Sequence, residues 1–282
     1  MQTLLLLPSS VTLEELPSSG LRQNGETSDW NWPAFAAITA IQLWAAHACV
    51  FFAHEYAHSF LAWLLGWKAN PFALNYAHPT LTVFLIQLGI DQNVNEVPIF
   101  ATGHGAQAAM ISAAGAVIGN ALVTYPLSRW VYRVAQRIPS RAWAMFAYWM
   151  CVASIGNFID YVPIRTFTDG TDLYQDMFAV ERGLGWSPWT LLLVFGIPTA
   201  FALLYFFFRI EPRTLRWLFP GSAARRAIMA ILTAFVLFDF YGAAGWADGG
   251  PTAHQMSVVS VCVVAPLIAA LSTIVVTRKI GV

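Results

Sequence analysis

The chain has 282 residues, of which 57% are hydrophobic and only 11% are charged, and its mean hydropathy is +0.57. A soluble domain usually carries about a quarter charged residues, so this composition indicates a chain that mostly faces lipid. The formal net charge is zero, which argues against a nucleic-acid partner. We therefore expect an integral, multi-pass membrane protein whose main surroundings are the lipid bilayer.

Residues 1–33 carry Ser, Pro, Gly and acidic side chains, and no basic stretch precedes their short apolar run. We expect a flexible or interfacial tail there and a single transmembrane domain over residues 34–282. A spanning helix needs about 20 mainly apolar residues. Six stretches fit, and they run from about Ala34 to Trp67, Ala106 to Trp130, Ala142 to Phe158, Trp189 to Phe208, Ala227 to Trp246 and His254 to Thr277.

Two connecting segments are too polar or irregular to span. In Lys68–Gly105, Pro, Asn and aromatic residues surround the β-prone run Leu81–Ile86, which predicts a small β-hairpin or re-entrant segment sheltered from lipid by protein. The other segment, Asp160–Pro188, is the most polar region after the tail. The predicted fold class is all-α and polytopic, with about six transmembrane helices.

Basic residues predict the orientation, because Lys and Arg gather in cytoplasmic loops. With six spans, the three basic clusters fall on one side, which places both termini in the cytoplasm. The opposite loops hold only Lys68, Arg165 and Arg182. The clusters comprise Arg129, Arg133, Arg137 and Arg141, then Arg209, Arg213, Arg216, Arg225 and Arg226, then Arg278 and Lys279.

A His-Glu-x-x-His motif, His54 to His58, lies in the first apolar stretch. Residues i and i+4 share one face of a helix, so the two imidazoles can hold one Zn²⁺ while Glu55 serves as general base toward a metal-bound water. Ionisable residues inside a spanning helix are costly and are by default functional. His47 lies about two turns away, too far to bind the same metal.

A catalytic zinc site also needs a third protein ligand. By the predicted topology, His54 and His58 lie in the outer half of the first helix. The segment Asp160–Pro188 begins at the outer end of the third helix and supplies acids that can reach them. These acids are Asp160, Asp169, Asp172 and Asp176.

Three elements in this order resemble the site-2 protease family of intramembrane metalloproteases, over roughly Ala46 to Asp172. They are the His54–His58 motif, the run Ala114-Gly115-Ala116-Val117-Ile118-Gly119-Asn120, which is similar to the family's Gly-Pro-x-x-Asn helix, and Asn157 to Gly170, which is similar to its Asn-x-x-Pro…Asp-Gly segment. Ala116 replaces the proline, and the spacing from Asn157 to Pro163 is longer than in the family.

The resemblance implies that His54 and His58 bind zinc, that Glu55 is the base, and that Asp169 or Asp172 completes the site. We favour Asp172, because it opens a predicted helix, Asp172–Arg182, and a helix start holds a ligand rigidly. By the same resemblance, Asn157 and Asn120 are candidates to position the substrate or polarise its carbonyl. Better-known members keep the site nearer the cytosol, whereas the loop charges here place it nearer the outside.

Two further features lie inside the apolar stretches. Asp239 is either an outer partner that orients a ligand histidine, or part of an aqueous cavity wall or of a hydrogen bond to another helix. Gly115 and Gly119 form a Gly-x-x-x-Gly motif, which predicts close packing of two helices.

The leading hypothesis is a zinc metalloprotease that hydrolyses a peptide bond of a membrane protein or peptide within or beside the bilayer. One alternative is a transporter or channel that uses the same His, Glu and Asp residues for metal or protons. Another is a catalytically silent homologue.

Overall fold

The computed structural model describes residues 31–76, 78–87, 89–90, 93–168, 176–247 and 249–278. Most of the predicted tail lies outside these ranges. The chain divides into two units, residues 1–37 and 38–282, and the architecture below is that of the second. The elements are α1 Trp32–Leu64, α2 Leu81–Ile86, α3 Val97–Ala101, α4 Gly105–Ala114, η1 Gly115–Thr124, α5 Tyr125–Arg137, α6 Arg141–Ile159, η2 Asp160–Ile164, η3 Arg165–Phe167, α7 Asp176–Leu184, α8 Pro188–Tyr205, η4 Phe206–Ile210, α9 Glu211–Leu218, α10 Ala223–Ala234, η5 Phe235–Phe240, α11 Gly250–Val259, η6 Ser260–Val264 and α12 Ala265–Thr277.

Five helices among the described residues are long and apolar enough to cross a membrane, as the predicted multi-pass fold requires. Several are continuous through a short π-helical segment, as where α4, η1 and α5 form one helix. The predicted stretch Ala227–Trp246 is not among the five. It forms the helices α10 and η5, and the charged residues Arg225 and Arg226 lie in the first turn of α10. The five helices are Trp32–Leu64, Gly105–Arg137, Arg141–Phe167, Pro188–Leu218 and Gly250–Thr277.

The predicted β-hairpin is wrong, because the β-prone run Leu81–Ile86 forms the helix α2, and no strand occurs in the described part of the chain. The Thr80 hydroxyl caps this helix by accepting the Val83 N–H at 3.1 Å. A helix satisfies its backbone locally, which matters more in an apolar setting than residue preference for strands.

The helix α2 returns along α1 toward the middle of that helix. The Trp44 indole donates to the Phe84 carbonyl at 2.9 Å, and Nε2 of His47 lies 3.3 Å from the Ile86 carbonyl. These contacts are 7 to 10 residues along α1 from His54, which is about 10–15 Å. The two side chains thus hydrogen-bond carbonyls at the end of α2, and the prediction of a re-entrant segment stays a prediction.

The third predicted span, Ala142–Phe158, continues further than expected. The helix runs without a break through η2 and η3 to Phe167, so the first residues of the segment predicted to be non-spanning are helical. Asp160 accepts a hydrogen bond from Nε of Arg165 at 2.8 Å. This ion pair allows two charged residues to remain on the helix.

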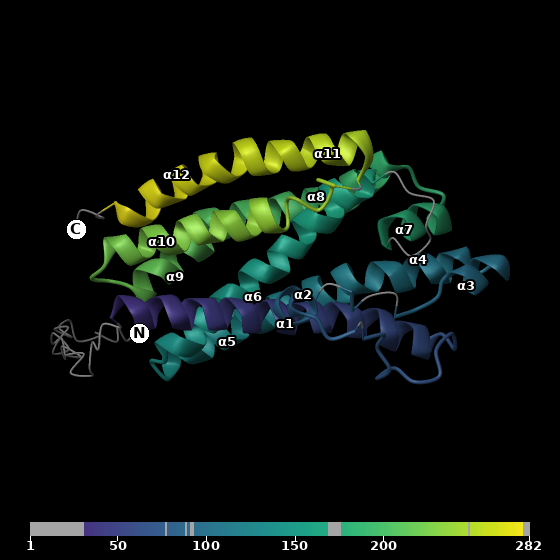
Figure 1. Ribbon diagram of the computed structural model, residues 1–282, viewed down its shortest axis with the longest axis horizontal. Helices are drawn as coiled ribbons and strands as arrows, with labels where there is room; N and C mark the ends of the chain where they lie inside the picture. Colours follow the sequence, from purple (N-terminus) through teal and green to yellow (C-terminus); the bar gives the residue numbers. More distant parts are fainter. Residues whose placement is uncertain are drawn as a thin grey trace, which may run out of the picture. The chain divides into compact units, whose positions relative to one another are not determined.

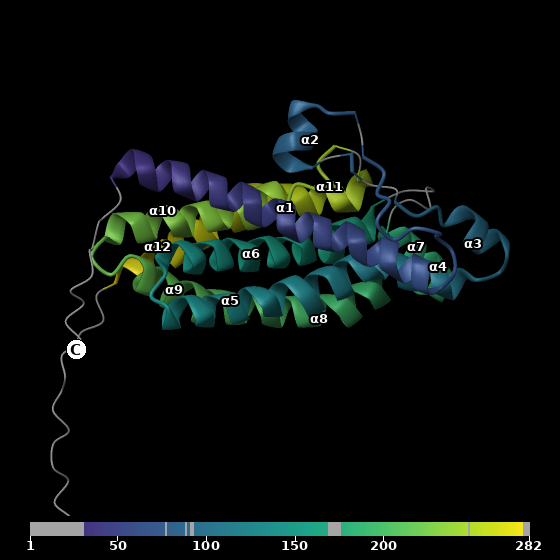
Figure 2. The same ribbon diagram turned by 90° about the horizontal axis from the view of Figure 1, so that it is seen from below.

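The long helices of the second unit run between two ends of a helix bundle (Figure 1). The turns after α5 and α9 and the end of α12 lie together at one end, whereas α7, α3 and the start of α4 lie at the other. Figure 2 shows α6 surrounded by its neighbours, and 83% of its most apolar window is buried. The basic clusters therefore gather at the end opposite α7.

Two apolar clusters fix the end that carries α7. In the first, Ala62 of α1 packs with Ile99 of α3 and Ile111 of α4. In the second, Met177 and Val180 of α7 pack with residues of η1, η2 and α8. The short helix α7 is thus docked on the bundle with its first residue, Asp176, facing α1.

Candidate metal centre

His54 and His58 of α1 and Asp176 of α7 converge on one point. The two imidazole centroids are 4.7 Å apart, as the i, i+4 spacing predicts. Oδ2 of Asp176 lies 3.5 Å from Nε2 of His54 and 3.4 Å from Nε2 of His58. Among the described residues, this is the group whose ligand atoms all lie within 4.8 Å of one another and can hold a metal ion.

The separations fit metal ligands better than hydrogen-bond partners. An N–H···O hydrogen bond usually measures about 2.7–3.2 Å. Ligand atoms placed about 2.0–2.2 Å from a tetrahedral zinc are separated by about 3.3–3.6 Å. The two distances to Asp176, 3.4 and 3.5 Å, fall in the second range.

The tautomer of His58 is fixed by the backbone of α4. Nδ1 lies 2.7 Å from the Ile111 carbonyl oxygen, and a carbonyl can only accept, so Nδ1 carries the proton. In the neutral imidazole, Nε2 then presents a lone pair toward Asp176. A hydrogen bond on the far nitrogen is the usual way to orient a metal-binding histidine.

His54 is held in a similar way by a side chain of η1. Its Nδ1 lies 3.2 Å from the amide of Asn120, which is fully buried. As placed, the amide nitrogen of Asn120 faces Nδ1. A half-turn of the amide would present its oxygen to Nδ1 instead, and the lone pair of His54 would then lie on Nε2. This Nε2 is buried and has no hydrogen bond in the described structure, so a metal ion would satisfy an atom that is otherwise costly to bury.

The surroundings of Gly119 confirm the close packing of two helices that the motif of Gly115 and Gly119 predicts. A Cβ on Gly119 would lie 2.6 Å from the Ala53 carbonyl oxygen and 2.8 Å from Cα of His54. A Cβ on Gly115 would collide with Nε2 of both histidines. Gly115 thus keeps open the space beside the two candidate metal-binding nitrogens.

The segment η2 covers the other side of His54. The Tyr161 ring stacks on the His54 ring, with centroids 4.9 Å apart and planes 27° apart. The Arg165 guanidinium lies over the Tyr161 ring, 4.8 Å from its centroid. Tyr161 therefore limits the orientations that the His54 ring can adopt.

Glu55 is buried and is oriented by the segment before α3. Nδ2 of Asn93 donates to Oε2 of Glu55 at 2.7 Å, and Oδ1 of Asn93 accepts the Asn75 N–H at 2.5 Å. Because a backbone N–H can only donate, this second bond fixes which end of the amide faces Glu55. Lys68 adds a third restraint by donating to the Asn93 carbonyl at 2.6 Å.

At this end of the bundle, two carboxyl groups outside the membrane-spanning helices have shifted pKa values. Burial by itself raises the pKa of Asp176, but His58 and His54 in their protonated, metal-free form outweigh it and hold that pKa well below its usual range. Burial, with a contribution from the charge of Asp176, raises the pKa of Glu96 to about 7. The site end thus combines one strongly ionised carboxylate with one that holds its proton up to neutral pH.

The structure brings together some of the predicted site residues and not others. Asp169 and Asp172 lie outside the described residues, so their role as ligands stays a prediction. Nδ2 of Asn157 donates to the Ala153 carbonyl of its own helix at 3.2 Å. Asp239 is not in the metal group, and Nδ1 of both ligand histidines already faces Asn120 or Ile111.

His47 lies outside the metal group, as predicted, and its Nδ1 lies 2.7 Å from the Tyr241 hydroxyl.

Sequence reasoning named Asp176 among four acids without favouring it, and it missed Asn93 and Glu96. It favoured Asp172, at the start of a predicted helix Asp172–Arg182, and the described part of that helix, α7, begins at Asp176. No local pattern marks Asn93 or Glu96, because both are placed by the tertiary path of the chain between α2 and α3.

Comparisons of the chain with protein-family models, curated proteins and solved structures found no match.

Proposed function

We propose that this protein is an intramembrane zinc metalloprotease with His54, His58 and Asp176 as its metal ligands. The observation that carries the proposal is the convergence of Nε2 of His54, Nε2 of His58 and Oδ2 of Asp176. The two histidines and the glutamate of their motif lie on α1, a helix apolar enough to cross a membrane. The similarity to the site-2 protease motifs supports the roles of His54, Glu55 and His58, whereas it implies Asp169 or Asp172 as the third ligand and the choice of Asp176 rests on geometry alone.

A zinc ion held by this set supplies Lewis-acid polarisation of a peptide carbonyl and lowers the pKa of water toward neutrality. The chain's own groups do the rest. Ile111 and Asn120 keep the two imidazoles in place, and Asn93 keeps the Glu55 carboxylate directed. Glu55 takes a proton from the attacking water and later delivers it to the leaving amine.

The site lies at the end of the bundle opposite the basic clusters (Figure 1). By the positive-inside rule this end faces away from the cytoplasm, so we propose membrane proteins or peptides cut near the outer face as substrates. A substrate helix must unwind there, because its own turns shield the scissile bond.

The test is cleavage of labelled single-span membrane peptides in liposomes by the wild type and Glu55→Gln. We expect the variant to retain zinc and to lose about 10²- to 10⁴-fold in rate, the usual contribution of a general base. Glu181→Gln, a carboxylate of α7 outside the metal group, is the matched control and should cut at the wild-type rate. Cleavage by Glu55→Gln at full rate would defeat the assignment.

A metal transporter uses the same residue types. Equal zinc uptake by liposomes that carry the wild type or the Glu55→Gln variant, without cleavage of any peptide, would favour that alternative.

A further inference from the structure

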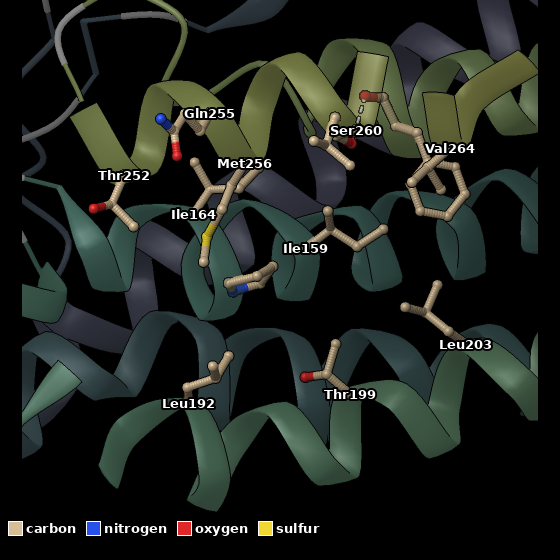
Figure 3. Close-up of a pocket in the computed structure, with 13 residues that line it drawn as sticks. Ile159, Ile164, Leu192, Thr199, Leu203, Thr252, Gln255, Met256, Ser260 and Val264 are labelled. Carbon is tan, nitrogen blue, oxygen red and sulfur yellow. Dashed lines mark hydrogen bonds between the residues drawn. The ribbon is translucent and has the colours of Figure 1, made fainter. Parts of the chain in front are cut away.

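A groove of about 560 Å³ lies between α8 and the helix formed by α11 and η6, with η2 and the end of α6 as its floor. Figure 3 shows Leu192, Thr199 and Leu203 along α8, opposite Thr252, Met256 and Val264. The groove is distinct from the metal centre, because Tyr161 of η2 stacks on His54 whereas Ile159 and Ile164 line the groove.

The walls of this groove belong to the part of the protein that faces lipid most fully. The spans Pro188–Leu218 and Gly250–Thr277 have the highest mean hydropathies of the five, 2.3 and 2.5, and only 17% of each apolar window is buried. A gap between two such helices opens to the bilayer. Left empty, it would forfeit the packing contacts of its lining.

The length of the groove matches one leaflet. From Leu192 to Leu203 it follows 11 residues of helix, and from Thr252 to Val264 it follows 12, which correspond to about 16–18 Å. This is about half of the ~30 Å hydrocarbon core. Both wall helices start at the metal-centre end, since Leu191 of α8 packs on α7 and the start of α11 lies at the same end in Figure 1.

Polarity changes along the groove in the sense that a lipid requires, because the hydroxyls of Thr199 and Ser260 farther along donate to the Phe195 and Phe238 carbonyls. Thr252 and Gln255, in the first turns of α11, lie at the mouth. Leu203 and Val264 line the deep end (Figure 3). The mouth suits the ester region of a lipid, and the deep end suits the methyl terminus of its chain.

We propose that this groove binds one acyl chain of a phospholipid from the leaflet on the metal-centre side. The chain fills the space behind η2, the segment whose other face holds Tyr161 against His54. A peptide held at the metal centre would lie on that other face, so we assign the groove to lipid and not to substrate.

The test is native mass spectrometry of the protein released from phospholipid nanodiscs into mild detergent. We expect one retained phospholipid per wild-type chain. Leu203→Trp fills the deep end and should lower its occupancy at least several-fold. Leu204→Trp is the matched control, because Leu204 is 53% exposed and does not line the groove; it should retain the lipid.

A second pair keeps the test decisive if Leu203→Trp does not fold. Leu192→Trp blocks the mouth, and Leu193→Trp, at a neighbouring position that is 62% exposed, does not. Equal lipid retention within both pairs would overturn the proposal. So would a loss confined to the affinity for a peptide substrate, which would assign the groove to the peptide. The lipid measurement does not depend on whether the protein is a protease.

Discussion

Asn93 orients one oxygen of the Glu55 carboxylate, and the Asn75 N–H fixes the direction of its amide. A general base contributes only while it points at the proton that it removes. A misplacement of about 1 Å can cost about 10²-fold in rate. In the proposed mechanism Asn93 is therefore a positioning residue, which acts through Glu55 without contacting the candidate metal ligands.

For Asn93→Ala we expect kcat to fall by about 10- to 100-fold, while KM and zinc content stay at the wild-type values. Steady-state cleavage kinetics and metal analysis of the same preparation check this. The matched control is Asn95→Ala, since the Asn95 side chain accepts the Val97 N–H of α3 and does not contact Glu55. A loss of zinc in Asn93→Ala would mean that Asn93 supports the fold of the centre and not the base.

At the scale of elements, α4 and η1 form the back wall of the centre. One helix face supplies the Ile111 carbonyl, the Asn120 amide and two glycines that admit α1 at close range. The contacts of His58 with Ile111 and of His54 with Asn120 thus both require the close approach of α1. The stability of this helix pair and the metal affinity should change together.

Gly119→Ala tests this coupling. The added methyl would lie 2.6 Å from the Ala53 carbonyl oxygen, so the helices must separate, and overpacking of this kind costs about 1–3 kcal/mol. We expect a lower melting temperature in detergent and weaker zinc binding. Gly221→Ala, where a Cβ has nothing within 4 Å, should change stability by less than about 0.5 kcal/mol. Unchanged melting of Gly119→Ala would show that α1 does not depend on this approach.

The elements also show which features local sequence determines. His54 and His58 share a face because of helix periodicity alone, and Gly115 and Gly119 mark a close helix contact for the same reason. The run Leu81–Ile86 misled, because β-branched residues favour strands only where a neighbouring strand can pair with them. In α2 the Thr80 cap and the carbonyl contacts from Trp44 and His47 favour a helix instead.

At the scale of the whole molecule, the centre joins residues more than 100 positions apart in the chain. Spacing along the sequence cannot identify Asp176, because its position depends on the docking of α7 through Met177 and Val180. The placement of the basic clusters at the opposite end is, in contrast, a simple consequence of antiparallel helices, and the order of the apolar stretches in the sequence predicts it.

Zinc content tests the central claim most directly, because it requires α1 and α7 to meet. Purified protein exposed to zinc and then freed of unbound metal should hold one zinc ion per chain. His58→Ala and Asp176→Ala should each lose it, whereas Asp239→Ala, which removes a membrane carboxylate outside the group, should keep it. A wild type without bound zinc, or a zinc content unchanged in Asp176→Ala, would contradict the account.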